Sequence, residues 1–191
     1  MKILAATGNK GKIREFSQIL SPLGFETVSP KDIGIDIDPE ETGTTFAENA
    51  LIKAQAFMQA ANMPVIADDS GLMVDYLDGA PGIYSARYAE GSDADRCDKL
   101  LCNMENAENR TARFVSAVAM VFPDGKTVEA EGYCEGEITR SPVGENGFGY
   151  DPVFYIASMG KTVAQMSADE KNAISHRGKA LRLLAEKLKN N

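Results

Sequence analysis

The sequence predicts an α/β fold with an antiparallel portion, and three observations support this prediction. Short apolar runs typical of strands alternate with segments whose apolar residues recur at helical spacing. Capping-box patterns at Thr45 and Ser167 mark the starts of two helices. Two β-rich stretches flank a Pro123-Asp124-Gly125 turn, as in a hairpin. No repeat or linker interrupts the chain, so we expect one domain over residues 1–191.

In the first half of the chain, strands and helices alternate. Strands are expected at 2–6, 25–29, 65–67 and 72–76. The first helix carries apolar residues at helical spacing and ends at Ser21-Pro22-Leu23-Gly24; these residues are Ile13, Phe16, Ile19 and Leu20. An acid-rich loop over 30–43 leads to the long helix that Thr45 opens.

The second half begins with a helix over 93–107, expected to bury Leu100, Leu101 and Met104. The hairpin follows, with strands at 113–122 and 126–133. A glycine-rich loop over 144–152 precedes a short strand at 153–156. The last helical segment runs from Ser167 to Lys189, with an interruption near 175–178.

The composition narrows the class of protein. With 28 Asp and Glu against 20 Lys and Arg, the formal net charge is −8, which argues against a general nucleic-acid binder. No apolar run approaches the roughly 20 residues of a membrane span, and the first residues lack a secretory signal pattern. We therefore expect no nucleic-acid partner, no membrane contact and a cytoplasmic location.

Cysteine and histidine usage excludes several metal sites. Cys97, Cys102 and Cys134 are odd in number and lack CxxC spacing, so neither a disulfide framework nor a zinc site is expected. Reduced thiols are the preferred interpretation. His176 is the single histidine, which rules out any multi-histidine metal site.

A strand-to-helix turn with the sequence Thr7-Gly8-Asn9-Lys10-Gly11-Lys12 is a candidate phosphate site. Its two glycines let the backbone approach a ligand, and a helix N-terminus with two lysines attracts an anion. The spacing does not match a Walker A loop or GxGxxG. A plain turn between strand and helix remains the alternative.

Carboxylates near the strand at 65–67 form a candidate metal site. Asp68-Asp69-Ser70-Gly71 follows this strand, at the end where α/β proteins place ligands. Neighbouring residues of an extended chain point to opposite sides, so one Asp can face a site while the other is structural. Oxygen ligands suit Mg²⁺. Glu41 contributes only if folding brings it near Asp69, and an acidic turn is the alternative.

Two later segments offer groups that recognise a base. Gly147-Phe148-Gly149-Tyr150-Asp151-Pro152 presents aromatic rings for stacking, or anchors a loop to the core. Lys171 and Ser175-His176-Arg177 supply hydrogen-bond donors, or form a solvated helix face. Together with the phosphate and metal candidates, these groups are typical of a nucleotide-hydrolysing site.

Six segments, in order from residue 7 to residue 181, resemble the inosine triphosphate pyrophosphatase family of XTP/dITP diphosphatases. They are TGNKGK at 7–12, ETG with FAENA at 41–50, ADDSG at 67–71, GAPGIYSARY at 79–88, GFGYDP at 147–152 and EKNAISHRGKAL at 170–181. The resemblance implies an elongated mixed β-sheet with flanking helices and two lobes around a central cleft. It also implies a Mg²⁺-dependent homodimeric enzyme that hydrolyses small-molecule purine nucleoside triphosphates (ITP, dITP, XTP) to monophosphate and pyrophosphate.

The same resemblance implies roles for individual residues. Asp69 is the expected general base and a metal ligand, and Glu41 is the second metal ligand. The remaining expected substrate-binding residues are Thr7, Gly8, Asn9, Lys10, Gly11, Lys12, Ser70, Phe148, Gly149, Tyr150, Asp151, Lys171, His176 and Arg177.

Three alternatives stay open on the sequence alone. One is a pyrophosphatase with other preferred nucleotides, and another is a nucleotide-binding module without catalysis. The third is a sugar- or inositol-phosphatase that uses Asp68 and Asp69 and releases free phosphate.

Overall fold

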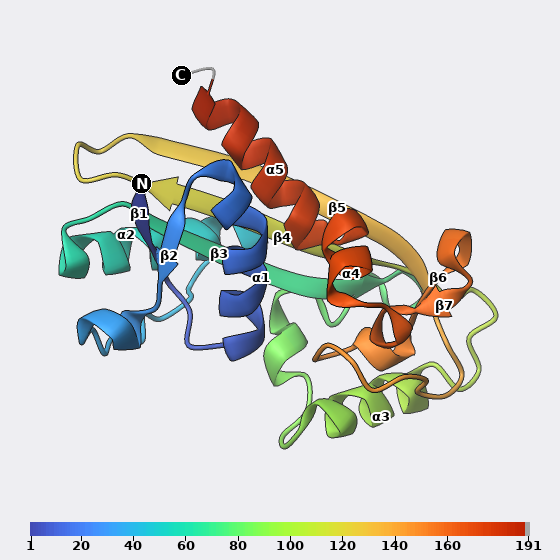
Figure 1. The fold of residues 1–191 in the computed structure, drawn as a ribbon. Coiled ribbons are helices and arrows are strands. Elements are labelled where there is room, and N and C mark those ends of the chain that lie inside the picture. Colours follow the sequence, from blue (N-terminus) through green and yellow to red (C-terminus); the bar gives the residue numbers. More distant parts are fainter. Residues whose placement is uncertain (190–191) are drawn as a thin grey trace. The chain divides into compact units, whose positions relative to one another are not determined.

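A computed structural model describes residues 1–189 and shows a seven-stranded mixed sheet with helices beside it (Figure 1). The strand order is β2-β1-β3-β4-β5-β6-β7. The strands are β1 Lys2–Ala5, β2 Glu26–Val28, β3 Val65–Val74, β4 Thr111–Val121, β5 Thr127–Ile138, β6 Phe154–Ile156 and β7 Lys161–Thr162. The helices are α1 Lys10–Leu20, α2 Phe46–Ala61, α3 Asp93–Asn103, α4 Ala168–Ile174 and α5 His176–Lys189. The predicted α/β class with a mixed sheet is confirmed.

Strand direction changes across the sheet. β1 pairs in parallel with β2, with Lys2 opposite Glu26, and in parallel with β3, with Leu4 opposite Val65. β6 pairs antiparallel with both β5 and β7. The predicted antiparallel portion is therefore present, and it includes β7, a two-residue strand that the sequence pattern did not indicate.

The chain divides into two compact units, each with its own hydrophobic core. Unit 1 consists of residues 1–69, 116–132 and 176–191, and unit 2 of residues 70–115 and 133–175. Strands β3, β4 and β5 each contribute residues to both units. The expected single domain with two lobes around a cleft stays a prediction.

Unit 1 packs α1 and α5 against its strands. These two helices contact each other and lie side by side in Figure 1. Their apolar faces share one cluster with alternate strand residues such as Ile3, Ala5 and Ile66. Leu4 and Val65, which alternate with them, are also fully buried, so both faces of these strands are covered.

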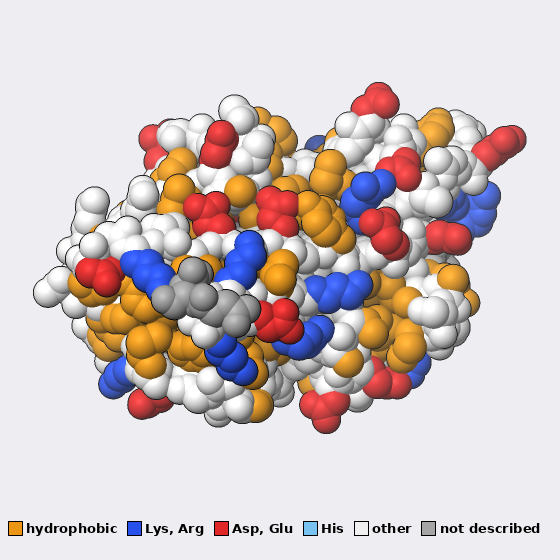
Figure 2. Space-filling view, turned by 90° about the horizontal axis from the view of Figure 1, so that it is seen from above, with side chains coloured by type: hydrophobic (Ala, Val, Ile, Leu, Met, Phe, Trp, Pro, Cys, Tyr) orange, Lys and Arg blue, Asp and Glu red, His pale blue; other side chains and the backbone are white. Residues whose placement is uncertain are grey.

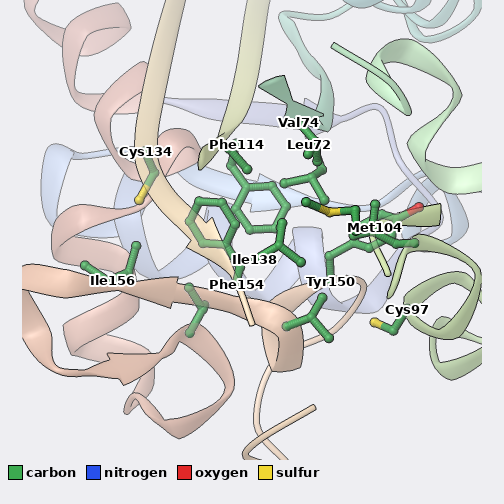
Figure 3. Packing of buried hydrophobic residues seen from close by; sticks show 14 of the residues in the cluster. Leu72, Val74, Cys97, Met104, Phe114, Cys134, Ile138, Tyr150, Phe154 and Ile156 are labelled. Carbon is green, nitrogen blue, oxygen red and sulfur yellow. The ribbon is translucent and has the colours of Figure 1, made fainter. Parts of the chain in front are cut away.

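Unit 2 has a core that combines α3 with strand and loop residues (Figure 3). Phe114 and Phe154 lie at its centre, with ring centroids 4.4 Å apart and planes tilted by 45°. Cys97 of α3 and Tyr150 of the glycine-rich loop belong to the same cluster. The loop is therefore anchored in the core by at least one of its aromatic side chains.

Local sequence sets where the helices begin. The predicted capping boxes are both present: the hydroxyls of Thr45 and Ser167 accept hydrogen bonds from the N–H groups of Glu48 and Glu170. The interruption expected near 175–178 is also confirmed, because Ser175 has an extended backbone between α4 and α5.

Three predicted boundaries were wrong. The second hairpin strand, expected over 126–133, continues as β5 to Ile138. β3 runs without a break from Val65 to Val74, so Asp68 and Asp69 lie inside a strand and not in a turn after it. The strand continues through these acidic residues because other segments of the chain supply partners for them. A local sequence pattern does not reveal such partners. The helix expected over 93–107 ends at Asn103, where the backbone turns at Met104. Leu100 and Met104 are buried as expected, whereas Leu101 is only partly buried.

Three features that the composition raised can be compared with the structure: the surface charge, membrane-spanning helices and the cysteines. In the view of Figure 2, Lys and Arg side chains are interspersed with acidic, hydrophobic and neutral groups. Within residues 1–189, no helix has the length and apolar character needed to cross a membrane. Within the part of the chain that the structure describes, Cys97, Cys102 and Cys134 form no disulfide.

At Gly132 of β5, the backbone at the start of α5 lies close to the strand. A Cβ at this position would lie 2.5 Å from the backbone nitrogen of Ala180 and also overlap the carbonyl oxygen of His176. We expect Gly132→Ala to lower the free energy of unfolding by about 1–3 kcal/mol, because helix and strand must separate. Urea denaturation measures this loss. Gly8→Ala is the control, since a Cβ at Gly8 meets nothing within 4 Å; equal stability of the two variants contradicts the packing argument.

Candidate functional site

The turn between β1 and α1 is shaped by two of the predicted phosphate-binding residues. The Asn9 side chain accepts hydrogen bonds from the N–H groups of Gly11 (2.8 Å) and Lys12 (3.1 Å), and so caps α1. The Thr7 hydroxyl accepts a hydrogen bond from the Asn9 N–H at 3.1 Å. The first turn of α1 carries Lys10 and Lys12 and no acidic residue. The turn is thus a positively charged helix N-terminus, as the phosphate hypothesis requires.

Lys12 and Asp68 belong to a buried ion-pair network in unit 1. The Asp68 carboxylate lies 3.1 Å from Lys12 Nζ through Oδ1, and accepts hydrogen bonds from Arg177 Nε (3.0 Å) and Nη2 (2.8 Å) through Oδ2. Arg177 also pairs with Glu15. Asp68 and Arg177 are each 1% exposed. Three segments of chain, α1, β3 and α5, therefore meet at one carboxylate.

The charges in this network fix its protonation states. Burial by itself would raise the pKa of Asp68, but Arg177, Lys12 and Lys53 outweigh it and hold that pKa well below its usual range. Burial lowers the pKa of Lys12, an effect that the nearby Asp68 charge only partly offsets. Asp68 is therefore an ionised structural group, and its partner Lys12 stands at the start of α1.

Asp69 has a different environment from its neighbour. Its Oδ2 accepts a hydrogen bond from Asn49 Nδ2 at 3.2 Å, and Asn49 Oδ1 accepts one from the Gly43 N–H at 2.8 Å. Asn49 thus joins the Glu41-Thr42-Gly43 segment to β3. Burial raises the pKa of Asp69, and the negative charge of Glu41 raises it further. Glu41 is therefore near enough to Asp69 for its charge to act on that carboxyl, which is the condition for a role of Glu41.

Lys53 was not among the residues singled out from the sequence. Its Nζ lies 2.5 Å from Glu41 Oε1 and donates a hydrogen bond to the Asp68 carbonyl oxygen at 3.1 Å. Asn49 and Lys53 stand four residues apart on α2, amid the apolar face formed by Phe46, Ala50, Ala54 and Phe57. Polar residues at helical spacing on a buried face are a signal that the sequence does contain.

Glu41 and Asp69 have the chemistry needed to bind a Mg²⁺ ion together with substrate phosphates. Both supply hard oxygen donors, and the negative charge of Glu41 raises the pKa of Asp69, a repulsion that a cation relieves. Among residues 1–189, no group of three or more His, Cys, Asp or Glu side chains is arranged to hold a metal ion. Mg²⁺ commonly takes one or two carboxylates and fills its remaining positions with water and phosphate oxygens.

The glycine-rich loop in unit 2 holds Phe148 and Lys171 together. Asp151 is buried, and its Oδ2 accepts hydrogen bonds from Lys171 Nζ (2.7 Å) and the Phe148 N–H (3.0 Å). Lys171 Nζ lies 4.4 Å from the centroid of the Phe148 ring. Phe148 is half-buried, whereas Tyr150 is buried and donates its hydroxyl hydrogen to the Ser85 carbonyl at 2.7 Å. Tyr150 is therefore a loop anchor, and Phe148 is the ring with an accessible surface.

The structure distributes the expected site residues over both units. Unit 1 contains Thr7, Gly8, Asn9, Lys10, Gly11, Lys12, Glu41, Asp69, His176 and Arg177. Unit 2 contains Ser70, Phe148, Gly149, Tyr150, Asp151 and Lys171. Ser70 is half-buried in β3, and His176 is the buried first residue of α5. The expected substrate-binding roles stay predictions. For Arg177, the structure shows a guanidinium held by Asp68 and Glu15.

These features define a class of protein: an α/β protein with a basic helix N-terminus, two carboxylates, Glu41 and Asp69, of which one acts on the charge of the other, and a partly exposed aromatic ring beside a lysine. The chain belongs to the Ham1 family, whose model matches residues 3–187.

Relatives and solved structures extend over nearly the whole chain. The dITP/XTP pyrophosphatase of Bacillus licheniformis is 50% identical, over 96% of this chain and 96% of its own. The dITP/XTP pyrophosphatase of Haemophilus influenzae is 49% identical, over 98% of both chains. The Ham1 protein of Staphylococcus aureus has a TM-score of 0.88 at 45% identity, covering 100% of this chain and 99% of its own.

Substitution of the neighbouring residues Asp68 and Asp69 is expected to change the free energy of unfolding by very different amounts. Asp68→Asn leaves Arg177 and Lys12 without a full counter-charge, so we expect the free energy of unfolding at neutral pH to fall by about 3–5 kcal/mol. Asp69→Asn is the matched control on the same strand. Because the fold already disfavours the charge of Asp69, this variant should unfold at nearly the wild-type urea concentration.

The pH dependence provides a second check on Asp68. Its folded-state pKa is lowered from 3.8, so its contribution is present above about pH 4 and is lost as the pH falls below that value. The difference in free energy of unfolding between wild type and Asp68→Asn should therefore shrink in acid. A difference that stays constant from pH 7 to pH 3 contradicts the ion-pair assignment.

Proposed function

We propose that this chain hydrolyses dITP, XTP and ITP to the nucleoside monophosphate and pyrophosphate. The observation that carries the proposal is that Asn49 and Lys53 of α2 hold Asp69 and Glu41, in the same unit as the basic turn at Thr7–Lys12. A protein that only binds polyphosphate gains nothing from two carboxylates close together, whereas a hydrolase needs a base and a metal site. Relatives at about half identity are dITP/XTP pyrophosphatases, which supports the same reaction here.

Each residue has a chemical task in this proposal. The N–H groups and lysines at the start of α1 neutralise phosphate charge, which otherwise repels an attacking oxygen. Asp69 accepts a proton from the water that attacks the α-phosphorus. The bond from the α-phosphorus to its bridging oxygen breaks, and pyrophosphate leaves with that oxygen. Asn49 orients Asp69, and Lys53 holds Glu41 in place.

The proposed cofactor is Mg²⁺, held by Glu41 and Asp69. When bound, Mg²⁺ lowers the energy of negative charge that develops on the phosphate oxygens. The raised pKa of Asp69 reflects burial and the charge of Glu41, and a bound cation would offset that repulsion.

Selectivity for the base would rest on hydrogen-bond donors. Hypoxanthine and xanthine carry a carbonyl at position 6, where adenine carries an amine. A buried donor such as Lys171 Nζ pairs with the carbonyl but leaves the amine without a partner, which discriminates strongly. The half-buried Phe148 ring beside Lys171 supplies a surface for stacking.

We also propose that the protein is a homodimer and acts in the cytoplasm, as the resemblance and the sequence imply. Light scattering coupled to size-exclusion chromatography tests the dimer, since a mass near 20.6 kDa is that of the monomer.

A panel of nucleoside triphosphates tests the reaction and its substrates. With Mg²⁺ present, dITP, XTP and ITP should be hydrolysed with higher kcat/KM than dATP or dUTP, and pyrophosphate should be released. Release of free phosphate indicates a phosphatase, and no turnover at saturating Mg²⁺ indicates a binding module. Faster turnover of dATP or dUTP overturns the substrate assignment alone.

The general-base assignment is tested by Asp69→Asn. We expect kcat for dITP to fall by about 10²- to 10⁴-fold, as is typical when a general base is lost, while circular dichroism and the melting temperature stay close to wild type. Asp98→Asn, an exposed substitution of the same kind on α3, serves as the control. Retention of wild-type kcat in Asp69→Asn rejects the assignment.

A further inference from the structure

Gly149, next to Phe148, has both of its backbone polar groups held by α3. Its N–H donates a hydrogen bond to Asp93 Oδ2 at 2.6 Å, and its carbonyl oxygen accepts one from Cys97 Sγ at 3.5 Å. Asp93 and Cys97 are four residues apart and therefore occupy the same face of the helix. The two peptide groups on either side of the Gly149 Cα are thus each fixed by the same helix.

The two side chains of α3 are themselves well positioned for this contact. Asp93 forms an ion pair with Arg96 through its other oxygen, Oδ1, so its carboxylate is held from both sides. Cys97 is 2% exposed and belongs to the core of unit 2. Burial, together with the charge of Asp93, raises the pKa of the Cys97 thiol to about 11, which keeps it protonated and able to donate.

The loop needs such restraint because glycines flank its aromatic residue. Gly147 and Gly149 both have positive φ angles, 79° and 63°, which glycine reaches at little cost. Glycine also has the largest backbone freedom in the absence of restraint. Asp151 fixes the Phe148 N–H from within the loop, and α3 fixes the peptide that follows.

We propose that Asp93 and Cys97 are positioning residues for base recognition, which hold Phe148 and Lys171 in the orientation that contacts the base. This inference rests on the proposed function, in which Phe148 stacks on the base. It assigns a specificity role to α3, a helix whose sequence carries none of the segments on which the family resemblance is based.

The kinetic test compares Asp93→Ala with Asp98→Ala, which removes an exposed carboxylate from the same helix. We expect Asp93→Ala to raise KM for dITP about tenfold, as the loss of one charge-assisted hydrogen bond allows, and to lower the ratio of kcat/KM for dITP over dATP. Asp93→Asn, which keeps an oxygen acceptor for the Gly149 N–H, should recover most of both values. Wild-type KM and selectivity in Asp93→Ala overturn the proposal.

Cys97 provides an independent pair of variants for use if Asp93→Ala does not fold. Cys97→Ala removes the donor to the Gly149 carbonyl, whereas Cys97→Ser keeps one. The selectivity ratio should fall in Cys97→Ala and be retained in Cys97→Ser. Equal ratios in these two variants count against the proposal.

A spectroscopic readout separates the inference from the proposed function. The protein has no tryptophan, so Phe148→Trp introduces a single tryptophan in the loop, whose fluorescence can be excited separately from that of the six tyrosines. Acrylamide should quench this fluorophore more strongly when Asp93→Ala is added than when Asp98→Ala is added. Equal quenching overturns the positioning role even if dITP is hydrolysed. Stronger quenching, combined with no hydrolysis of dITP by the wild-type protein, confirms the restraint of the loop and rejects the function.

Discussion

The carboxylate of Asp68 is the constraint on which unit 1 depends. Asp68 lies inside β3, and its carboxylate pairs with Lys12 of α1 and Arg177 of α5. Lys53 of α2 donates a hydrogen bond to the backbone carbonyl oxygen of the same residue. An isolated carboxylate at 1% exposure would be prohibitively costly, so the position of each cation is fixed by the need to compensate it. The same contacts set the positions of the groups around the candidate site, because Lys12 opens α1 and Asp69 is the next residue of β3.

Asp68 and Asp69 are neighbours on one strand, but one carboxylate has a structural role and the other is the candidate catalytic group. The alternation of side chains directs the two carboxylates to different partners, a guanidinium on one side and an amide on the other. The charge on Asp68 is strongly stabilised, whereas burial and Glu41 make the charge on Asp69 less favourable. A carboxylate of the second kind is the better proton acceptor, since its affinity for protons is raised by its environment.

Much of the fold and part of the site follow from local sequence patterns. Capping residues, apolar spacing and turn residues locate the starts of α2 and α4, the hairpin and the break at Ser175. The same patterns do not predict that β3 continues through Asp68 and Asp69, because the partners that permit this come from helices distant in sequence. They also do not distinguish Phe148 from Tyr150, or reveal that Arg177 is committed to two carboxylates. Those outcomes depend on long-range packing, as does the contact between Asp93 and Gly149.

The position of Arg177 late in the chain has a consequence for biosynthesis. Unit 2 lies entirely between Asp69 and His176 in sequence, so a ribosome completes it before it reaches the guanidinium that neutralises Asp68. Until α5 emerges, the nascent β3 carries a carboxylate without its main counter-ion, and the strands of unit 1 lack a helix that covers them. Domains generally fold as units once their residues are available. All of unit 2 is therefore synthesised before the guanidinium that completes the ion-pair network of unit 1.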